Sequence, residues 1–261
     1  MLVRAVRDVV GSDSISAVGI SVTGPVDRIG RQVHNPATLA DWSGTPWPAQ
    51  LEQALGVPVV LENDAVGAAI GEAEFGAGRD ADVMAMVTLG TGVGVAVVSR
   101  SSGAWRGTAG FHPEAGHIPV SLDSELCYCG LQGCWESTSS GAGIRRLWTT
   151  RDGQIDWLGY GRALSRGLRA VGRMYAPQVI VIGGGIARNY NDFITPVLEH
   201  FAGNDPMGPA NAPTIACAEL EHSAIFGAAT IARRQKTPPQ PDPAHPGGWF
   251  RAAGVSTKKR S

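Results

Sequence analysis

The chain has 261 residues, 43% of them hydrophobic, which is enough to bury a substantial core in one large domain or two lobes. Its 22 lysine and arginine residues nearly balance 23 aspartate and glutamate residues, for a formal net charge of -1. This balance leaves no electrostatic footprint for nucleic acid, and no apolar run reaches membrane-spanning length. The opening MLVRAVRDVV is too short and too charged for a secretory signal. We therefore expect a cytoplasmic protein without nucleic-acid or membrane partners.

Residues 1–80 are expected to form an N-terminal α/β lobe. Short β-branched runs bounded by turn residues predict strands over Ser16–Val22 and Val57–Leu61. A helical pattern with proline in its first turn predicts a helix over Trp47–Leu55. A second helix, rich in alanine and glycine, is expected to run to about Phe75.

Residues 81–235 are expected to form a C-terminal lobe. Val83–Leu89 and Val95–Val98 flank a glycine turn, which predicts a strand, a turn and a returning strand. Alternating apolar runs and helical spacing then predict further strands and helices over Arg162–Tyr175, Val179–Ile182, 186–201, Thr214–Ala218 and Ala224–Ala232. The proline-rich segment 236–261 is predicted to be a disordered tail.

Three of the four cysteines lie close to a histidine in the sequence, as His117, Cys127, Cys129 and Cys134. One imidazole nitrogen and three thiolates make a closed tetrahedral set that Zn²⁺ binds well. The glycines of the C-x-C-G-x-x-G-C run let the backbone fold tightly around a metal. Buried unliganded cysteines are the alternative, and disulfides find no support from a secretory signal. The spacing therefore predicts a structural zinc site.

Asn63 and Asp64 stand where a predicted strand gives way to a helix. A carboxylate at the carboxyl end of a buried strand is well placed for chemistry in a crevice. Asn and Asp are also favoured helix N-caps, because they satisfy free backbone N–H groups. The two roles are compatible, and Asp64 is the candidate catalytic residue.

Two glycine-rich turns are candidates for binding phosphate groups. The turn from Gly90 to Gly94 presents successive backbone N–H groups and the hydroxyl of Thr91. Its spacing matches neither a Walker loop nor a Rossmann fingerprint, and a simple tight turn is the alternative. Gly183 and Gly184 follow a predicted buried strand, where they could accommodate a nucleotide or only allow close helix–strand packing.

Glu114 and Glu136 flank the predicted metal site. Carboxylates are natural acceptors for adjacent sugar hydroxyls, although surface charge is the plainer interpretation. If His117 binds zinc through one ring nitrogen, its other nitrogen can point an N–H outward in a fixed orientation. These three residues therefore predict a sugar pocket shaped by the zinc site.

Together these motifs resemble the ROK family (repressor, ORF, kinase) of sugar kinases and sugar-responsive repressors. The resemblance covers about Ala17–Arg234. It is carried by Val59-Val60-Leu61-Glu62-Asn63-Asp64, Thr88-Leu89-Gly90-Thr91-Gly92-Val93-Gly94, Glu114-Ala115-Gly116-His117 and the cysteine run from Cys127 to Glu136. It implies an α/β, two-lobed, actin-like (ribonuclease H-like) sugar kinase fold.

The resemblance also implies roles for individual residues. Asp64 would be the general base that takes a proton from a sugar hydroxyl, with ATP and Mg²⁺ supplying the phosphoryl group. The sugar would be held by Asn63, Glu114, His117 and Glu136. The nucleotide would be approached by Thr91, Gly92 and Gly184, and structural zinc would be bound by His117, Cys127, Cys129 and Cys134. Family members commonly pair, so a homodimer is implied.

One departure from the family pattern concerns the N-terminal region. Family members begin with a strand and hairpin carrying an Asp-x-Gly-x-Thr-type phosphate motif, and no such motif precedes Ala17. We therefore expect a truncated N-terminal lobe that lacks about three strands, part of the phosphate site and the pairing of one strand edge.

The sequence predicts an ATP-dependent kinase for a hydroxyl of a hexose, related sugar or cyclitol. His112-Pro113-Glu114 resembles a variant found in fructokinase-like members, but the motifs do not identify the sugar. The alternative is a non-catalytic sugar-binding or sensor member of the family, or a degenerate kinase. A zinc-ribbon interaction module would explain the cysteines but neither Glu136 nor the turn at Gly90.

Overall fold

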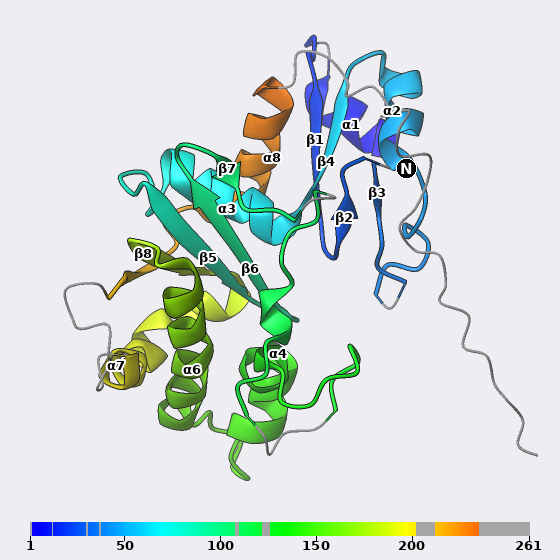
Figure 1. Ribbon diagram of the computed structural model, residues 1–261. Coiled ribbons are helices and arrows are strands. Elements are labelled where there is room, and N and C mark those ends of the chain that lie inside the picture. The colour runs from blue at the N-terminus through cyan, green and yellow to red at the C-terminus, as the bar shows by residue number, and fades with distance from the viewer. Residues whose placement is uncertain are drawn as a thin grey trace, which may run out of the picture.

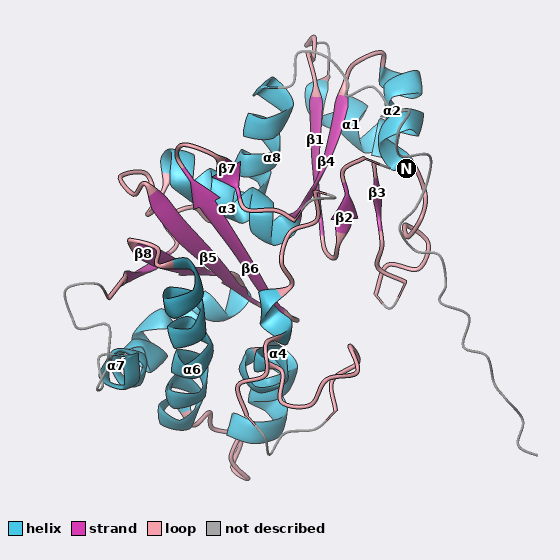
Figure 2. Ribbon diagram, viewed as in Figure 1, coloured by secondary structure: helices cyan, strands magenta, loops and turns pink. Residues whose placement is uncertain are grey.

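The computed structural model describes residues 2–11, 13–29, 31–36, 38–107, 110–121, 126–201 and 212–234, and the predicted tail at 236–261 lies outside them. In these ranges the chain forms two groups of strands with helices around them (Figures 1 and 2). No helix in the described part is both long enough and apolar enough to span a membrane.

The N-terminal elements form two small strand pairs beside two helices, α1 (Leu2–Val10) and α2 (Trp47–Leu55). Strand β1 (Val18–Val22) pairs in parallel with β4 (Val59–Asn63), and β2 (Val26–Asp27) pairs antiparallel with β3 (Gln32–Val33). Helix α2 matches its predicted bounds and ends at Gly56, a left-handed position that suits glycine.

The prediction for β4 was wrong by two residues at each end. The strand covers Val59–Asn63 rather than Val57–Leu61 because its register with β1 runs from Val18 opposite Val59 to Val22 opposite Asn63. The paired strand therefore extends directly to Asp64, the first residue of helix α3 (Asp64–Phe75). This connection places the candidate catalytic carboxylate at the carboxyl end of a buried strand.

The larger sheet has the order β7-β6-β5-β8-β9. Strand β5 (Val83–Leu89) pairs antiparallel with β6 (Val93–Ser99) and parallel with β8 (Val179–Gly183). The short β7 (Gly103–Ala104) and β9 (Thr214–Cys217) lie at the two edges. The predicted strands are confirmed, although the returning strand begins at Val93 and shortens the glycine turn.

The two faces of this sheet are covered by different helices. Along β5, Ala85 and Val87 pack on one side with residues of α6 (Trp157–Tyr175) and α7 (Tyr190–Phe201). Met84 and Met86 point to the other side, toward α3. This alternation is the period of two expected for a strand buried on both faces. The turns at the ends of β5 and β8 therefore extend from strands that are packed on both faces.

Several helical segments differ from their predicted bounds. Helix α6 begins at Trp157 rather than near Arg162, because the Asp156 side chain accepts a hydrogen bond from the N–H of Gly159 and caps it. The helix predicted after Gly185 divides into a 3₁₀ segment and α7. Short helical segments complete this part of the chain, at Ala115–His117, Trp135–Ser139 (α4), Gly141–Gly143 (α5), Ile144–Trp148 and Gly185–Asn189.

Helix α8 (Ser223–Arg234) returns to the N-terminal elements and packs against α3 and β1 (Figure 1). The two helices approach closely because glycines line their contact. A Cβ on Gly71 would overlap the carbonyl oxygen of Ser223, and one on Gly227 would overlap that of Gly67. The end of the described chain therefore lies against the same helix that begins with Asp64.

Candidate functional site

One cavity of about 1320 Å³ brings together most of the residues singled out in the sequence. It is lined by backbone at the ends of β5 and β8 and by residues from α3, α4 and the loops before α4. The candidate residues on its wall are Asp64, Gly90, Thr91, Gly92, Gly94, Glu114, His117, Glu136, Gly183 and Gly184, with Cys129 at the metal cluster. Asn63, Cys127 and Cys134 lie outside the lining.

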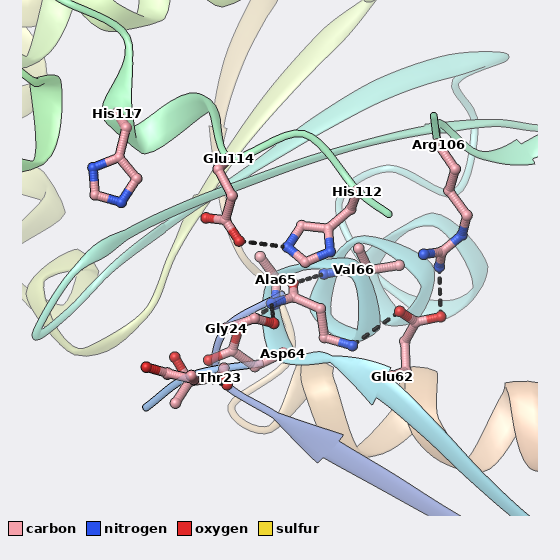
Figure 3. A network of polar contacts seen from close by, with 12 residues as sticks. Thr23, Gly24, Glu62, Asp64, Ala65, Val66, Arg106, His112, Glu114 and His117 are labelled. Atoms are coloured by element: carbon pink, nitrogen blue, oxygen red, sulfur yellow. Dashed lines mark hydrogen bonds and ion pairs between the residues drawn. The ribbon is translucent and has the colours of Figure 1, made fainter. Parts of the chain in front are cut away.

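Asn63, rather than Asp64, is the N-cap of α3. Its Oδ1 accepts a hydrogen bond from the N–H of Val66 at 3.1 Å, and its Nδ2 donates to the carbonyl of Gly24 at 3.1 Å. Asn63 is buried, so it acts as a brace between β4, α3 and the turn after β1. The capping alternative is therefore confirmed for Asn63, while the carboxylate of Asp64 points to the cavity (Figure 3).

The carboxyl group of Asp64 lies in a partly buried environment at the start of α3. Burial raises the pKa of the Asp64 carboxyl above its ordinary value, and a hydrogen bond from the N–H of Ala65 at 2.9 Å opposes this rise. Nearby His112 also lowers this pKa, and Glu114 raises it. A carboxylate with a raised pKa is a better proton acceptor than a fully solvated one.

The Gly90–Gly94 turn is connected to the Glu136 side of the cavity. The N–H of Val93 donates to Oε2 of Glu136 at 2.9 Å, and the N–H of Gly141 donates to the carbonyl of Gly90 at 2.8 Å. A Cβ at Gly92 would overlap the Glu136 carboxylate. The absence of a side chain at Gly92 therefore allows Glu136 to reach the turn.

Gly184 has φ 85° and ψ 178°, a combination that is nearly restricted to glycine. A Cβ there would also lie 2.5 Å from the carbonyl oxygen of Leu89, so the ends of β5 and β8 could not approach as they do. This close approach joins two strand ends, so the alternative named for this turn, close helix–strand packing, stays a prediction. The same packing leaves bare backbone on the wall of the cavity.

The four predicted metal ligands converge on one point. Their nearest ligand atoms all lie within 4.8 Å of one another. Cys127 Sγ is 3.5 Å from His117 Nδ1, and Cys129 Sγ is 3.5 Å from Cys134 Sγ, with no disulfide among them. Three thiols and one imidazole at this spacing fit a closed tetrahedral zinc site.

The two ring nitrogens of His117 have different surroundings. Nδ1 faces the cysteine cluster, whereas Nε2 lies 3.1 Å from the hydroxyl of Tyr128 on the cavity wall. Metal binding through Nδ1 would keep the proton on Nε2 and fix its direction. The arrangement would give the cavity a hydrogen-bond donor of defined orientation.

The model of the ROK family matches residues 2–235 of this chain. The chain belongs to the ROK family. It is 28% identical to a glucokinase of Thermotoga maritima over 276 aligned residues, which cover 90% of this chain and 84% of the relative. It is also 26% identical to the xylose repressor of Bacillus subtilis over 191 aligned residues, covering 66% of this chain and 49% of the repressor.

Among solved structures, the chain resembles a ROK family glucokinase from Streptomyces griseus in complex with glucose and AMPPNP. The TM-score is 0.74 at 30% sequence identity, and the match covers 89% of this chain and 88% of that one. The α/β ROK sugar kinase fold of actin-like type, expected from the sequence, is therefore confirmed. Both sugar kinases and repressors occur among the relatives of this ROK protein.

Sequence reasoning missed one polar residue on the cavity wall of this ROK protein, Tyr128, and two residues behind the wall, Arg106 and His112. Arg106 forms a buried ion pair with Glu62, the residue before Asn63, and donates to the carbonyl of Gly110 at 3.1 Å. His112 contacts Glu114, and Tyr128 contacts His117. The H-P-E pattern was a signal for His112. Arg106 had none, because its partner is 44 positions away in the sequence.

Proposed function

We propose that this ROK protein transfers a phosphoryl group from ATP to a hydroxyl of a hexose, a related sugar or a cyclitol. The observation that carries the proposal is the shared cavity, where Asp64, Glu114 and Glu136 face the turns at Gly90 and Gly184. Phosphoryl transfer depends mainly on positioning and charge stabilisation. A carboxylate, a sugar pocket and backbone at the ends of two strands supply those requirements in one place.

In this proposal Asp64 is the general base. The sugar hydroxyl oxygen forms a bond to the γ-phosphorus, the bond from that phosphorus to the bridging oxygen of ADP breaks, and the hydroxyl proton passes to the Asp64 carboxylate. Asn63 supports the role because it caps α3 itself and leaves the carboxylate of Asp64 facing the cavity. Partial burial of that carboxylate favours proton acceptance.

The sugar is assigned to the side of the cavity formed by Glu114, His117 and Glu136. Carboxylate oxygens accept hydrogen bonds from adjacent hydroxyls, and Nε2 of His117 can donate one. Asn63 supports this pocket from behind by bracing the turn at Gly24, since its own side chain is already hydrogen-bonded. The S. griseus relative was solved with glucose, which supports a hexose as the first substrate class to test.

The nucleotide is assigned to the other side, near Thr91, Gly92 and Gly184. Bare backbone at Gly184 and the N–H groups of Thr91 and Gly92 could approach phosphate oxygens without a bulky side chain in the way. ATP with Mg²⁺ would supply the phosphoryl group and shield its charge. The AMPPNP in the S. griseus complex is an ATP analogue and supports this donor.

Zinc has a structural role in this proposal. The four ligands His117, Cys127, Cys129 and Cys134 leave no open coordination position in a tetrahedral site, so the metal would not bind substrate. It would instead hold His117 and the segment leading to Glu136 in place.

A non-catalytic sugar sensor is the second candidate, and the similarity to a xylose repressor favours it. Such a protein would use the same sugar pocket without turnover. The two candidates therefore differ at Asp64, whose replacement should abolish catalysis in a kinase while leaving a sensor largely unaffected.

The test is phosphoryl transfer from ATP and Mg²⁺ to a panel of hexoses, pentoses and cyclitols, with calorimetric sugar binding in parallel. A kinase should phosphorylate at least one compound, and Asp64→Asn should lower kcat by about 10²–10⁴-fold or more while retaining sugar binding. Binding without turnover would favour the sensor. Equal turnover by the wild type and Asp64→Asn would overturn the assignment of the base.

A further inference from the structure

His112 is a buried side chain that contacts a candidate sugar-binding carboxylate. Its Nε2 lies 3.1 Å from Oε1 of Glu114, and its side chain is 3% exposed, compared with 42% for Glu114. Glu114 lies in a loop, just before the 3₁₀ segment at Ala115–His117. Figure 3 shows this contact, and because the His112 side chain is buried whereas the Glu114 carboxylate is exposed, His112 is the fixed side of the pair.

The residue between them explains why this contact is well defined. Pro113 fixes its own backbone φ and restricts the preceding residue to extended conformations. Side chains two positions apart in an extended segment point to the same side. His112 and Glu114 therefore meet as local neighbours, and little conformational entropy is lost when they do.

The second ring nitrogen of His112 is unusual. Nδ1 is buried and has no hydrogen-bond partner among the described residues. A carboxylate on Nε2 selects the tautomer with its proton there, which leaves Nδ1 as an unsatisfied acceptor. Burying such a group without a partner is costly, and phenylalanine or leucine would fill the space without that cost. The imidazole is therefore better explained by its contact with Glu114 than by packing.

His112 also bears on the charge balance of the cavity. Glu114 and Asp64 are like charges, and Glu114 raises the pKa of Asp64. The N–H that His112 donates to Glu114 partly compensates the negative charge of that carboxylate, so Glu114 repels the Asp64 carboxylate less strongly. The same contact therefore orients Glu114 and reduces its repulsion of the proposed base.

We propose that His112 is a positioning residue, which holds Glu114 in the orientation that accepts hydrogen bonds from a sugar. This inference rests on the proposed function and deepens it, because it names the residue that sets the geometry of the sugar pocket. His112 itself touches no reacting atom. Its effect is expected on sugar affinity and sugar KM, with little change in the KM for ATP.

The test compares three substitutions that separate the two ring nitrogens. His112→Gln can still donate from the Nε2 position, His112→Asn keeps an amide only near the Nδ1 position, and His112→Phe keeps size alone. Calorimetry should show the sugar Kd rising by about 10–100-fold in His112→Asn and His112→Phe, because a hydrogen bond to a charged group is lost. His112→Gln should stay within about threefold of the wild type. Melting temperatures measured alongside identify any variant that fails to fold.

A double-mutant cycle with Glu114→Gln distinguishes positioning from general packing. If His112 acts through Glu114, His112→Phe should add little to the loss already caused by Glu114→Gln. Additive losses, an unchanged Kd in His112→Phe, or a His112→Gln variant as weak as His112→Phe would each overturn the inference.

The readouts also separate this inference from the proposed function. If the wild-type protein binds sugar without turnover, the proposed kinase activity is contradicted. The role of His112 can still be tested, because the sugar Kd of its variants can be measured. Turnover that depends on Asp64 but not on His112 would leave the kinase intact and overturn the role of His112. A wild-type protein that binds no sugar at all would overturn both.

Discussion

The backbone N–H of Val93 donates a hydrogen bond to the carboxylate of Glu136 at 2.9 Å. Val93 closes the glycine turn assigned to the nucleotide, and Glu136 belongs to the group assigned to the sugar. One contact therefore joins the two halves of the proposed site. It also gives Gly92 a function that its backbone conformation does not explain, because a larger residue there would meet Glu136.

Replacing Gly92 with alanine should weaken sugar binding. The added Cβ overlaps the end of the Glu136 side chain, which can swing away but then loses its bond from Val93. We expect the sugar Kd to rise by roughly tenfold, as for a lost hydrogen bond to a charged group, with a small change in melting temperature. Calorimetry and thermal unfolding check both expectations.

Gly172→Ala is the matched control for this substitution. Gly172 lies in α6, and a Cβ there would make only ordinary contacts of 3.5 Å with Phe201 and Pro213. This variant should bind sugar as the wild type does and be slightly more stable, since alanine favours a helix. Unchanged sugar affinity in Gly92→Ala would mean that Glu136 does not depend on the turn.

Asp64→Asn should lose turnover without losing stability. Burial raises the pKa of the Asp64 carboxyl, so the folded state holds this proton more tightly than the unfolded state does. The ionised carboxylate therefore costs stability once the pH rises through the folded-state pKa, and this cost is absent below the unfolded value. Neutral asparagine avoids it, so its melting temperature near pH 7 should equal or exceed that of the wild type. A marked drop in melting temperature would show that Asp64 is structural.

The same pKa gives the direction of the pH profile. A general base must be unprotonated, so kcat should fall as the pH decreases toward the raised pKa of Asp64. The inflection should lie above the ordinary aspartate value of 3.8. A wild-type kcat that stays flat down to pH 4 would contradict the role of this carboxylate.

Local sequence signals predicted the elements that carry the site. The bounds of α2 and α3 followed from Pro48 and from the Asn63-Asp64 pair, because capping chemistry is local. The glycine turns and the four metal ligands were likewise visible as spacing. The bounds of β4 and β6 were not, since each strand's ends are set by pairing with a partner strand.

What the sequence could not predict depends on contacts between distant segments. Arg106 follows β7 and Glu62 lies in β4, and their side chains meet although the two residues are distant in the sequence (Figure 3). The two-residue strands β2 and β3 are too short to give a periodic signal. Helix α1 does show helical spacing of apolar residues over its nine positions, and it was missed because the opening segment was assessed only as a possible secretory signal. The packing of α8 on α3 was also hidden, because a stripe of glycines is compatible with many partners.

The zinc prediction can be tested with two cysteine substitutions. Wild-type protein should contain about one equivalent of zinc, as expected for a closed four-ligand site. Cys134→Ser should lose most of it and become sensitive to proteolysis between Glu114 and Glu136. Cys217→Ser should keep it, because Cys217 lies on β9, outside the cluster. Metal-free wild-type protein with full sugar affinity would contradict the site.

Breaking the Glu62–Arg106 ion pair should destabilise the protein strongly. The two side chains are only 2% and 12% exposed, so Arg106→Ala leaves a buried carboxylate without its partner. A loss of about 3–5 kcal/mol in the free energy of unfolding is typical of such a change. Arg234→Ala removes a surface ion pair with Glu74. The side chains of Arg234 and Glu74 are 61% and 36% exposed, so the loss in the free energy of unfolding should be at most about 1 kcal/mol.

Chemical denaturation of the two single variants and of the double variant Glu62→Gln, Arg106→Met completes this test. The double variant removes both charges while keeping an acceptor for the N–H of Asn63, which bonds Oε1 of Glu62 at 2.9 Å. It should recover most of the stability lost in Arg106→Ala, because the penalty comes from the unpaired charge. Equal losses in Arg106→Ala and Arg234→Ala would show that Glu62 finds solvent, and that the loop after β7 does not hold the strand end before Asp64.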